Sequence, residues 1–380
     1  MFKDLPLIED NKKSITLFYP YIPKTALKAL KNVFSTRWIG QGPLVDKLEK
    51  VFSYKFADGM PSIAVGSGTD ALHLAYILAD IKKDDEILCP LFTCTATNIP
   101  LLYIGAKLVF VDINPSTMNM DIEIIKKSIT KKTKAIVFVN YGGLPCDLFE
   151  LNKIAKKHKI ILIQDAAQSL GSVYNNKSIT KYADYTIFSF QGIKHITSGD
   201  GGMLVLKNKT KINKALRIRW FGIDRKKKQM GNWKNDIKEI GYKYQMTDIG
   251  AALLLESIKD FKKISLHRKK IFRIYDEILS KNKKINIINK YGNFSHGNWI
   301  YTIVLDKKDY LQKQLRLNNI ETNQVHFRND RYSIFKNFIK NNKYKNMDSI
   351  DSKYLVLPVH LKMSLSDAKK IANLINRIIK

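Results

Sequence analysis

Lys194 stands in a setting that would turn a lysine into a nucleophile. Strand-forming and apolar residues, Phe188–Ile193, precede it, and the turn Gly199–Gly202 follows shortly after. Burial among such neighbours disfavours the ammonium and lowers the pKa of the amine, which can then form a Schiff base with a carbonyl compound. Because a single lysine is usually exposed, this interpretation depends on the residues that share its site. We expect the adjacent His195 to pack or to orient its neighbours.

Asp165 is the second chemically unusual residue, because it ends an apolar run, Lys159–Gln164. A buried carboxylate is costly unless it is paired. A carboxylate that faces a protonated pyridine nitrogen is paired, and it makes the ring an electron sink. Gln168, three residues later, is close enough to reach a hydroxyl on the same ring. The alternative is that Asp165 is the N-cap of a helix.

A glycine-rich turn, Gly66-Ser67-Gly68-Thr69, separates a predicted strand from a predicted helix. Glycines let the backbone approach a ligand closely, and the N–H groups at a helix start attract an anion such as phosphate. Ser189, five residues before Lys194, is placed to make a second phosphate contact. The alternative is an ordinary turn in which Thr69 is the helix N-cap. The turn does not match GxGxxG, so a Rossmann nucleotide site is not predicted.

The hydrophobic pattern predicts the scaffold that would bring these residues together. Short runs rich in Val, Ile and Leu alternate with helical patterns, as in a parallel sheet buried on both faces. The predicted strands are residues 62–66, 86–90, 107–113, 134–141 and 159–167, with a further candidate after Gly202. Ligands of such a sheet bind beyond the carboxyl ends of its strands. We therefore expect the lysine, the aspartate and the glycine-rich turn to form one site.

The pattern changes in the last third of the chain. A long helical segment covers residues 247–280, and residues 299–305, 309–319 and 321–327 then suggest a smaller α+β unit. The chain of 380 residues is long enough for two domains. We place the boundary on the long helix, which gives domains of residues 1–255 and 256–380.

The net charge of +31 raises the question of a nucleic-acid partner. Lysines are spread along the whole chain, whereas nucleic-acid footprints cluster on one element. The densest basic runs, residues 224–229 and 281–284, are short and have no interleaved aromatic residues. A solvated surface is therefore the favoured interpretation, and we expect no nucleic-acid partner. A basic rim would still attract an anionic substrate.

The cysteines and the hydropathy indicate where the protein works. Only Cys89, Cys94 and Cys146 are present, an odd set without a CxxC pair, which fits a reducing compartment and argues against disulfides or a zinc site. No metal site is expected. Residues 1–13 lack the apolar core of a signal peptide, and no run approaches the roughly 20 apolar residues of a membrane span. We expect a cytoplasmic protein that does not bind membranes.

Five segments in order resemble the DegT/DnrJ/EryC1/StrS family of sugar aminotransferases. They are GSGTDAL, PLFTCTATNIPLLYIGAKLVFVDI, QDAAQSLGS, FSFQGIKHITSGDGG and GYKYQMTDIGAALLLESI. With flanking matches from Trp38 to Pro358, the resemblance covers nearly the whole chain. It implies a fold-type I transferase that depends on pyridoxal 5'-phosphate (PLP). Such a protein has a large α/β domain with a mainly parallel seven-stranded sheet flanked by helices, and a smaller C-terminal α+β domain.

The resemblance also implies roles for individual residues around PLP. Lys194 would carry the cofactor as a Schiff base and shuttle protons, Asp165 would pair with the pyridine nitrogen, and Gln168 would contact the ring hydroxyl. The phosphate would be held by Gly68, Thr69 and Ser189.

Further roles concern the partner subunit and the substrate, since the resemblance implies a homodimer with two shared active sites. Lys243 would reach the phosphate bound by the partner subunit, and His326 and Arg328 would lie near the sugar. Cys94 replaces an aromatic residue that stacks on the cofactor ring in many relatives, which weakens this stacking contact. We do not expect Phe92 to substitute for this aromatic residue.

The expected reaction moves an amino group from L-glutamate, which becomes 2-oxoglutarate, to a nucleotide-linked 4-keto or 3-keto 6-deoxy sugar. A sugar dehydratase of the same family is the nearest alternative, but dehydratases carry histidine in place of Lys194. An aminocyclitol aminotransferase that uses glutamine is a second alternative. A non-catalytic basic binding protein on this fold is the alternative from another class, since fold does not dictate function.

Overall fold

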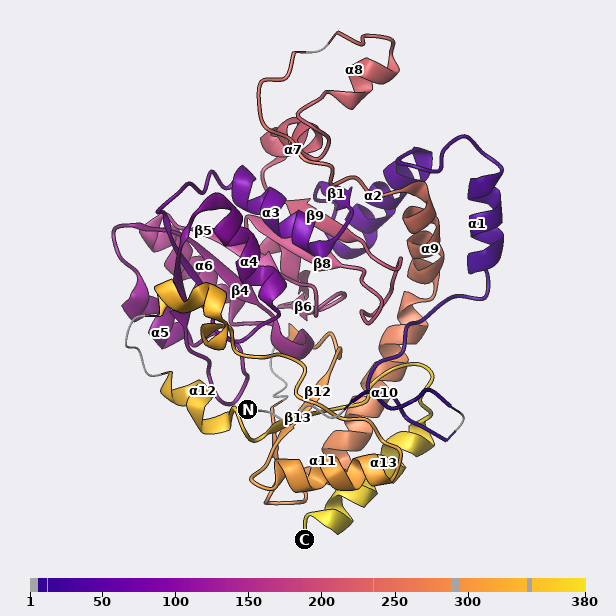
Figure 1. Ribbon diagram of the computed structural model, residues 1–380, viewed down its shortest axis with the longest axis vertical. Helices are drawn as coiled ribbons and strands as arrows, with labels where there is room; N and C mark the ends of the chain where they lie inside the picture. The colour runs from indigo at the N-terminus through magenta and orange to yellow at the C-terminus, as the bar shows by residue number, and fades with distance from the viewer. Residues whose placement is uncertain (1–5, 12, 235, 289–293, 340–343) are drawn as a thin grey trace.

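A seven-stranded sheet forms the centre of the larger part of the chain (Figure 1). The computed structural model describes residues 6–11, 13–234, 236–288, 294–339 and 344–380, so part of the amino-terminal segment considered above lies outside the described residues. The strand order is β1-β9-β8-β5-β4-β2-β3, and β9 alone runs antiparallel to its neighbours. The strands are β1 (Ser62–Val65), β2 (Glu86–Pro90), β3 (Lys107–Val111), β4 (Thr133–Val139), β5 (Ile161–Asp165), β8 (Tyr185–Ser189) and β9 (Gly202–Leu206).

Helices cover both faces of this sheet, because successive strand residues contribute to two separate hydrophobic clusters. Ile63 and Ile163 face the cluster that contains helices α3, α4 and α7, whereas Ala64 and Leu162 face the cluster that contains α2, α6 and α9. The predicted α/β fold with a mainly parallel sheet is confirmed. The helices of this part are α1 (Ala26–Phe34), α2 (Pro43–Phe56), α3 (Gly68–Leu78), α4 (Thr95–Ile104), α5 (Ile122–Ser128), α6 (Leu148–His158), α7 (Ile212–Ile218) and α8 (Arg225–Gln229).

The long helical segment predicted over residues 247–280 is two helices, α9 (Asp248–Lys259) and α10 (Phe261–Leu279). Asp260 separates them, and its carboxylate accepts a hydrogen bond of 2.6 Å from the hydroxyl of Tyr21. Helix α9 packs on α1 and α2, whereas α10 packs on α13 at the other end of the molecule (Figure 1). A division of the chain at residue 255 stays a proposal.

A smaller sheet, in the order β10-β12-β13, packs against α10, α11 and α13. Residues 321–327, predicted within this unit, contribute only a single bridge from Asn323 to Val356. The amino-terminal segment joins the unit as well, since Ile15 pairs with Ile320. The remaining elements are β6 (Val173–Tyr174), β7 (Lys177–Ser178), β10 (Asn286–Ile287), β11 (Phe294–Ser295), β12 (Tyr301–Val304), β13 (Tyr354–Leu357), α11 (Lys308–Leu317), α12 (Lys345–Ile350) and α13 (Leu365–Ile378).

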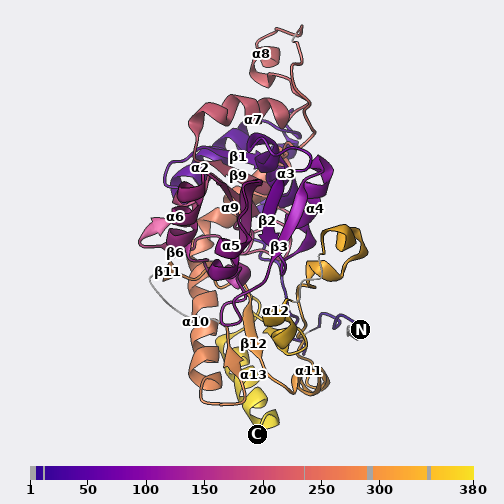
Figure 2. The ribbon, with the colours of Figure 1, turned by 90° about the vertical axis from the view of Figure 1, so that its left-hand side faces the viewer.

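A projecting arm, residues 221–234 and 236–243, extends from the large sheet beyond α7 and carries the short helix α8 at its far end (Figures 1 and 2). Apolar side chains of this arm are largely exposed; they are Phe221, Met230, Trp233, Ile237 and Ile240. Exposed apolar side chains gathered on a projection are typical of a contact with another chain.

Candidate active site

Lys194 lies in the loop that follows β8, and its side chain turns inward. The ammonium nitrogen is 4.0 Å from the centre of the Trp299 ring. Burial lowers the pKa of Lys194 most, while the nearby charges of Asp165 and Cys94 act in the opposite direction. A desolvated amine with a lowered pKa is the state that a Schiff-base lysine requires.

Asp165 ends β5 and is almost completely buried. One carboxylate oxygen accepts a hydrogen bond of 2.7 Å from the hydroxyl of Thr97, and the other accepts one of 3.0 Å from the Ala167 N–H. Burial raises the pKa of Asp165, and these two donors and the charge of Lys194 oppose that rise. No described helix begins at Asp165, so it is not a helix N-cap.

The two groups lie at the same end of the sheet, because Asp165 ends β5 and Lys194 is in the loop after the neighbouring parallel strand β8. Thr97 holds the carboxylate in place. Its single proton is donated to Asp165, so the neighbouring Thr93 hydroxyl, 3.0 Å away, donates to Thr97. Nothing in the sequence singles out either threonine, since the contact of Thr97 with Asp165 forms only when α4 folds beside the end of β5.

The glycine-rich turn reaches the same end of the sheet. Helix α3 begins at Gly68, and Ser67 is its N-cap, with an oxygen that accepts a hydrogen bond of 3.0 Å from the Asp70 N–H. Thr69 is therefore not the cap and lies in the first turn. Gly68 approaches Ser189 so closely that a Cβ on Gly68 would be 2.9 Å from the Ser189 Cβ. The three residues predicted to hold phosphate thus meet where β8 ends and α3 begins.

Gln168 connects the large sheet to His326. Its carbonyl oxygen accepts a hydrogen bond of 2.7 Å from the Gly142 N–H, and its amide nitrogen lies 3.0 Å from Nε2 of His326. The amide must donate here, so His326 Nε2 is an acceptor; burial lowers the pKa of His326 to about 3, which keeps the ring neutral. The predicted contact of Gln168 with a ring hydroxyl stays a prediction.

Arg328 is buried among carboxylates. Its three guanidinium nitrogens donate to the carboxylates of Asp330 and Asp348. These bonds use three of the five guanidinium N–H groups and fix the position of the side chain. The predicted contact of Arg328 with the sugar stays a prediction.

Lys243 and Cys94 are both exposed. Lys243 pairs through its backbone with Trp220 at the base of the projecting arm. Cys94 is the residue before α4, and its charge affects the pKa of Lys194, so the thiol lies near the amine. Phe92 does not replace the missing aromatic residue, because its ring is buried against Tyr141 and Tyr354.

Two observations concern the residues beside Lys194. His195 is buried, and its Nε2 lies 2.7 Å from the Gly297 carbonyl oxygen, which agrees with a packing role. Trp299, by contrast, was expected only as part of a strand. A lone tryptophan after Gly297-Asn298 carries no sequence signal of its contact with a lysine more than 100 positions away.

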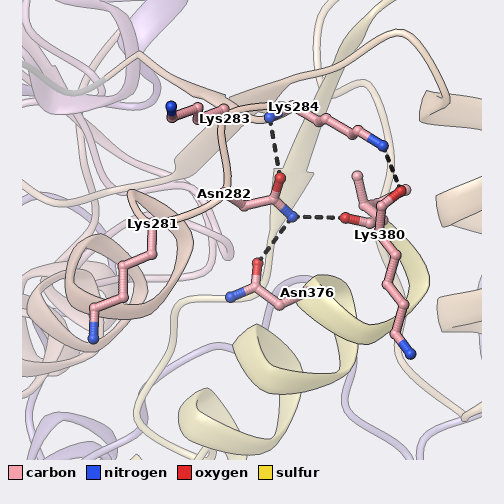
Figure 3. Close-up of a pocket in the computed structure, with 7 residues that line it drawn as sticks. Lys281, Asn282, Lys283, Lys284, Asn376 and Lys380 are labelled. Carbon is pink, nitrogen blue, oxygen red and sulfur yellow. Dashed lines mark hydrogen bonds between the residues drawn. The ribbon is translucent and has the colours of Figure 1, made fainter.

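A basic surface hollow of about 380 Å³ lies far from this site, between the ends of α10 and α13 (Figure 3). Its lysine ammonium groups point in different directions rather than toward a common centre; they belong to Lys281, Lys283, Lys284 and Lys380. Asn282 fills its middle through hydrogen bonds to Asn376 and to the Ile379 carbonyl. The hollow is therefore a solvated surface feature.

Within the ranges that the structure describes, no helix combines the length and apolar character of a bilayer span. No three His, Cys, Asp or Glu side chains in these ranges gather as a metal site would require.

The fold and this arrangement of lysine, aspartate and helix start define the class of fold-type I transferases. The model of the DegT/DnrJ/EryC1/StrS aminotransferase family matches residues 20–376, and the chain belongs to this family.

Individual relatives agree over most of the chain. The UDP-4-amino-4,6-dideoxy-N-acetyl-beta-L-altrosamine transaminase of Campylobacter jejuni (strain 81-176) is 30% identical over 373 residues, 96% of this chain and 97% of the relative. The GDP-perosamine synthase of Vibrio cholerae is 30% identical over 315 residues, which are 83% of this chain and 84% of the relative. The structure of AtS13 from Actinomadura melliaura superposes with a TM-score of 0.92 at 27% identity, over 97% of this chain and 100% of that one.

Proposed function

We propose that this protein is a PLP-dependent aminotransferase that passes an amino group from L-glutamate to a nucleotide-linked 4-keto or 3-keto 6-deoxy sugar. The observation that carries the proposal is the placement of an inward-turned lysine, Lys194, and a buried carboxylate, Asp165, at the ends of two neighbouring parallel strands. Transaminase and synthase relatives that act on UDP- and GDP-linked sugars support the substrate class.

The residues present fit PLP. The start of α3 supplies N–H groups without helical partners and a favourable dipole, as a phosphate dianion needs. The contact of Gly68 with Ser189 keeps both backbones close to that position. Asp165, a carboxylate held by two donors, matches a protonated ring nitrogen. When bound, PLP supplies an electron sink for the carbanion next to the amino group.

The chain itself supplies positions and proton transfers. Lys194 would hold the cofactor. Once displaced, its amine would accept a proton from the α-carbon of the donor as a general base and pass it to the cofactor as a general acid. Because burial lowers the pKa of Lys194, more of its amine is unprotonated and able to accept that proton. Asp165 keeps the proton on the ring nitrogen by charge. The neutral His326, beside Trp299 and Gln168, presents no charge to the sugar and bounds the space around it.

We also propose a homodimer whose two active sites are shared. Lys243 lies at the base of the projecting arm and is exposed, so it is free to reach a second chain. Exposed apolar residues on α1, Leu27 and Phe34, add to those on the arm. The cytoplasm is the proposed location, because the cysteines are free and a reducing compartment keeps them so.

The test is an absorbance and product assay on purified protein. Protein loaded with PLP should be yellow, lose the colour with L-glutamate and regain it with a keto-sugar acceptor. A panel of dTDP-, UDP- and GDP-linked 4-keto and 3-keto 6-deoxy sugars, read by the mass of the aminated product, identifies the substrate. Turnover by Lys194→Ala would contradict the proposal, as would a colourless protein that retains nucleic acid.

A further inference from the structure

The Lys194 amine rests against an aromatic face. Among the described residues, it has no carboxylate within salt-bridge distance, although the charge of Asp165 acts on it from farther away. The nearest defined contact is the ring of Trp299, whose centre is 4.0 Å from the ammonium nitrogen. An indole face attracts a cation through its quadrupole, and it does so more strongly where water is excluded. Trp299 is only 1% exposed.

Trp299 cannot easily turn away from this position, because its backbone is bonded on both sides. Its N–H donates to the Gly142 carbonyl at 3.0 Å, and its own carbonyl accepts a hydrogen bond of 3.1 Å from Arg268. Two further rings lie near it, with Phe18 at 5.7 Å and His326 at 6.2 Å between ring centres. The indole is therefore a fixed wall of the site.

The same ring also holds the backbone next to the lysine. Its indole N–H donates a hydrogen bond of 3.0 Å to the carbonyl of Ile193, the residue before Lys194. Trp299 thus contacts the backbone next to Lys194 as well as the amine at the end of its side chain. A tryptophan of the small unit in this way fixes the reach and the direction of a side chain that belongs to the large sheet.

We propose that Trp299 is a positioning residue whose indole face is the resting place of the Lys194 amine whenever that amine is not bound to the cofactor. This inference rests on the proposed function, because only a lysine that is released and recaptured in each cycle needs a resting place. A cation–π contact of about 0.5–2 kcal/mol is weak enough for the amine to leave the indole and strong enough to orient the lysine side chain. No bond is made or broken at the indole.

The first test follows the emission of the indole itself as the pH changes. In cofactor-free protein, protonation of an amine against the indole alters the tryptophan emission. We expect wild-type emission to show a step with pH that is missing from Lys194→Met and from Trp299→Phe. Identical pH curves for the wild type and Lys194→Met would overturn the inference.

The second test follows capture of PLP by stopped-flow absorbance. Trp299→Leu, which removes both the face and the N–H, should slow capture by roughly 3- to 30-fold, in line with the cation–π range. Trp299→Phe, which keeps a smaller face, should recover part of the rate. Tyr54→Leu, at an exposed aromatic residue of α2, is the control and should capture PLP at the wild-type rate.

The outcomes separate this inference from the proposed function. A wild-type rate in a folded Trp299→Leu protein would overturn the role of Trp299 and leave the aminotransferase proposal standing. Failure of the wild type to bind PLP through Lys194 would end the aminotransferase proposal, and the emission curves would still report whether the amine rests on the indole.

Discussion

At the scale of single residues, the site depends on two ionisable groups that are each driven toward their neutral form by burial. Lys194 has a lowered pKa and Asp165 a raised one, and desolvation is the largest cause in both cases. Both groups were predicted from the sequence, because a carboxylate or an amine within apolar runs is unusual. A cofactor that supplies a cationic ring nitrogen and an aldehyde would satisfy both.

Lys194→Met should raise the free energy of unfolding of the cofactor-free protein at neutral pH. Native Lys194 has a pKa below its ordinary 10.5, so between these two values the unfolded chain binds more protons and wild-type stability rises with pH. The advantage of the methionine variant should therefore shrink across that window. Urea unfolding at several pH values measures it. Lys50→Met, at an exposed lysine of α2, is the control and should show no such trend.

Thr97→Val should weaken the function of Asp165 while it preserves the shape of the core. A hydrogen bond to a charged group contributes about 1.5–3 kcal/mol, so we expect kcat to fall roughly tenfold to a hundredfold. The pKa of Asp165 should rise further, because the Thr97 hydroxyl lowers it. A pH titration of the cofactor absorbance measures the shift. Thr97→Ser should restore both properties, and equal activity of Val and Ser variants would refute the role.

Trp299 and Thr97 show what the sequence cannot reveal at this scale. Both act through contacts that form only when distant elements pack, since Thr97 lies on α4 and Asp165 ends β5. Arg328 is a related case. The family resemblance predicts a role in substrate binding, and only the structure shows that carboxylates bind part of its guanidinium.

At the scale of elements, the phosphate position depends on how closely α3 approaches the end of β8. Six of the seven strands were predicted, because each contains a short apolar run that suits a sheet buried on both faces. Strand β8, with the sequence YTIFS, was not among the predicted strands. The break between α9 and α10 was not predictable. Asp260 and Phe261 are both compatible with a continuous helix, and the interruption depends on the contact with Tyr21.

Gly68→Ala should impair cofactor binding through this approach. The new Cβ would be 2.9 Å from the Ser189 Cβ, so α3 or β8 must shift. Overpacking of this kind costs about 1–3 kcal/mol, and we expect a similar loss in the affinity for PLP. Fluorescence titration of cofactor-free protein with PLP measures it. Gly40→Ala, whose Cβ would meet no atom within 4 Å, is the matched control. Equal affinity in the two variants would show that the approach does not matter.

At the scale of the whole molecule, a complete site requires two chains if Lys243 reaches the phosphate of the partner. The net charge of +31 is spread over the surface, and the basic hollow of Figure 3 shows lysines that do not converge.

The projecting arm is the part that the sequence alone does not explain. Its apolar residues are too sparse for a core, and only the structure shows that they point away from the body.

Complementation between two inactive variants tests the shared site. Lys194→Ala and Lys243→Ala should each be impaired alone. After unfolding and refolding as an equal mixture, half of the dimers pair one of each and hold one intact site, so about a quarter of wild-type activity should return. Sedimentation should give twice the chain mass of 43.8 kDa. A mixture no more active than its components would show that Lys243 serves its own chain.

The identity of the lysine that binds PLP is tested most directly by reduction and mass mapping. Borohydride treatment of the PLP-loaded protein makes the lysine–cofactor bond permanent, and peptide mass spectrometry locates it. We predict a single pyridoxyl-phosphate group on the peptide that contains Lys194, and none in Lys194→Ala. A label on another lysine, or no label in a protein that binds PLP, would contradict the assignment.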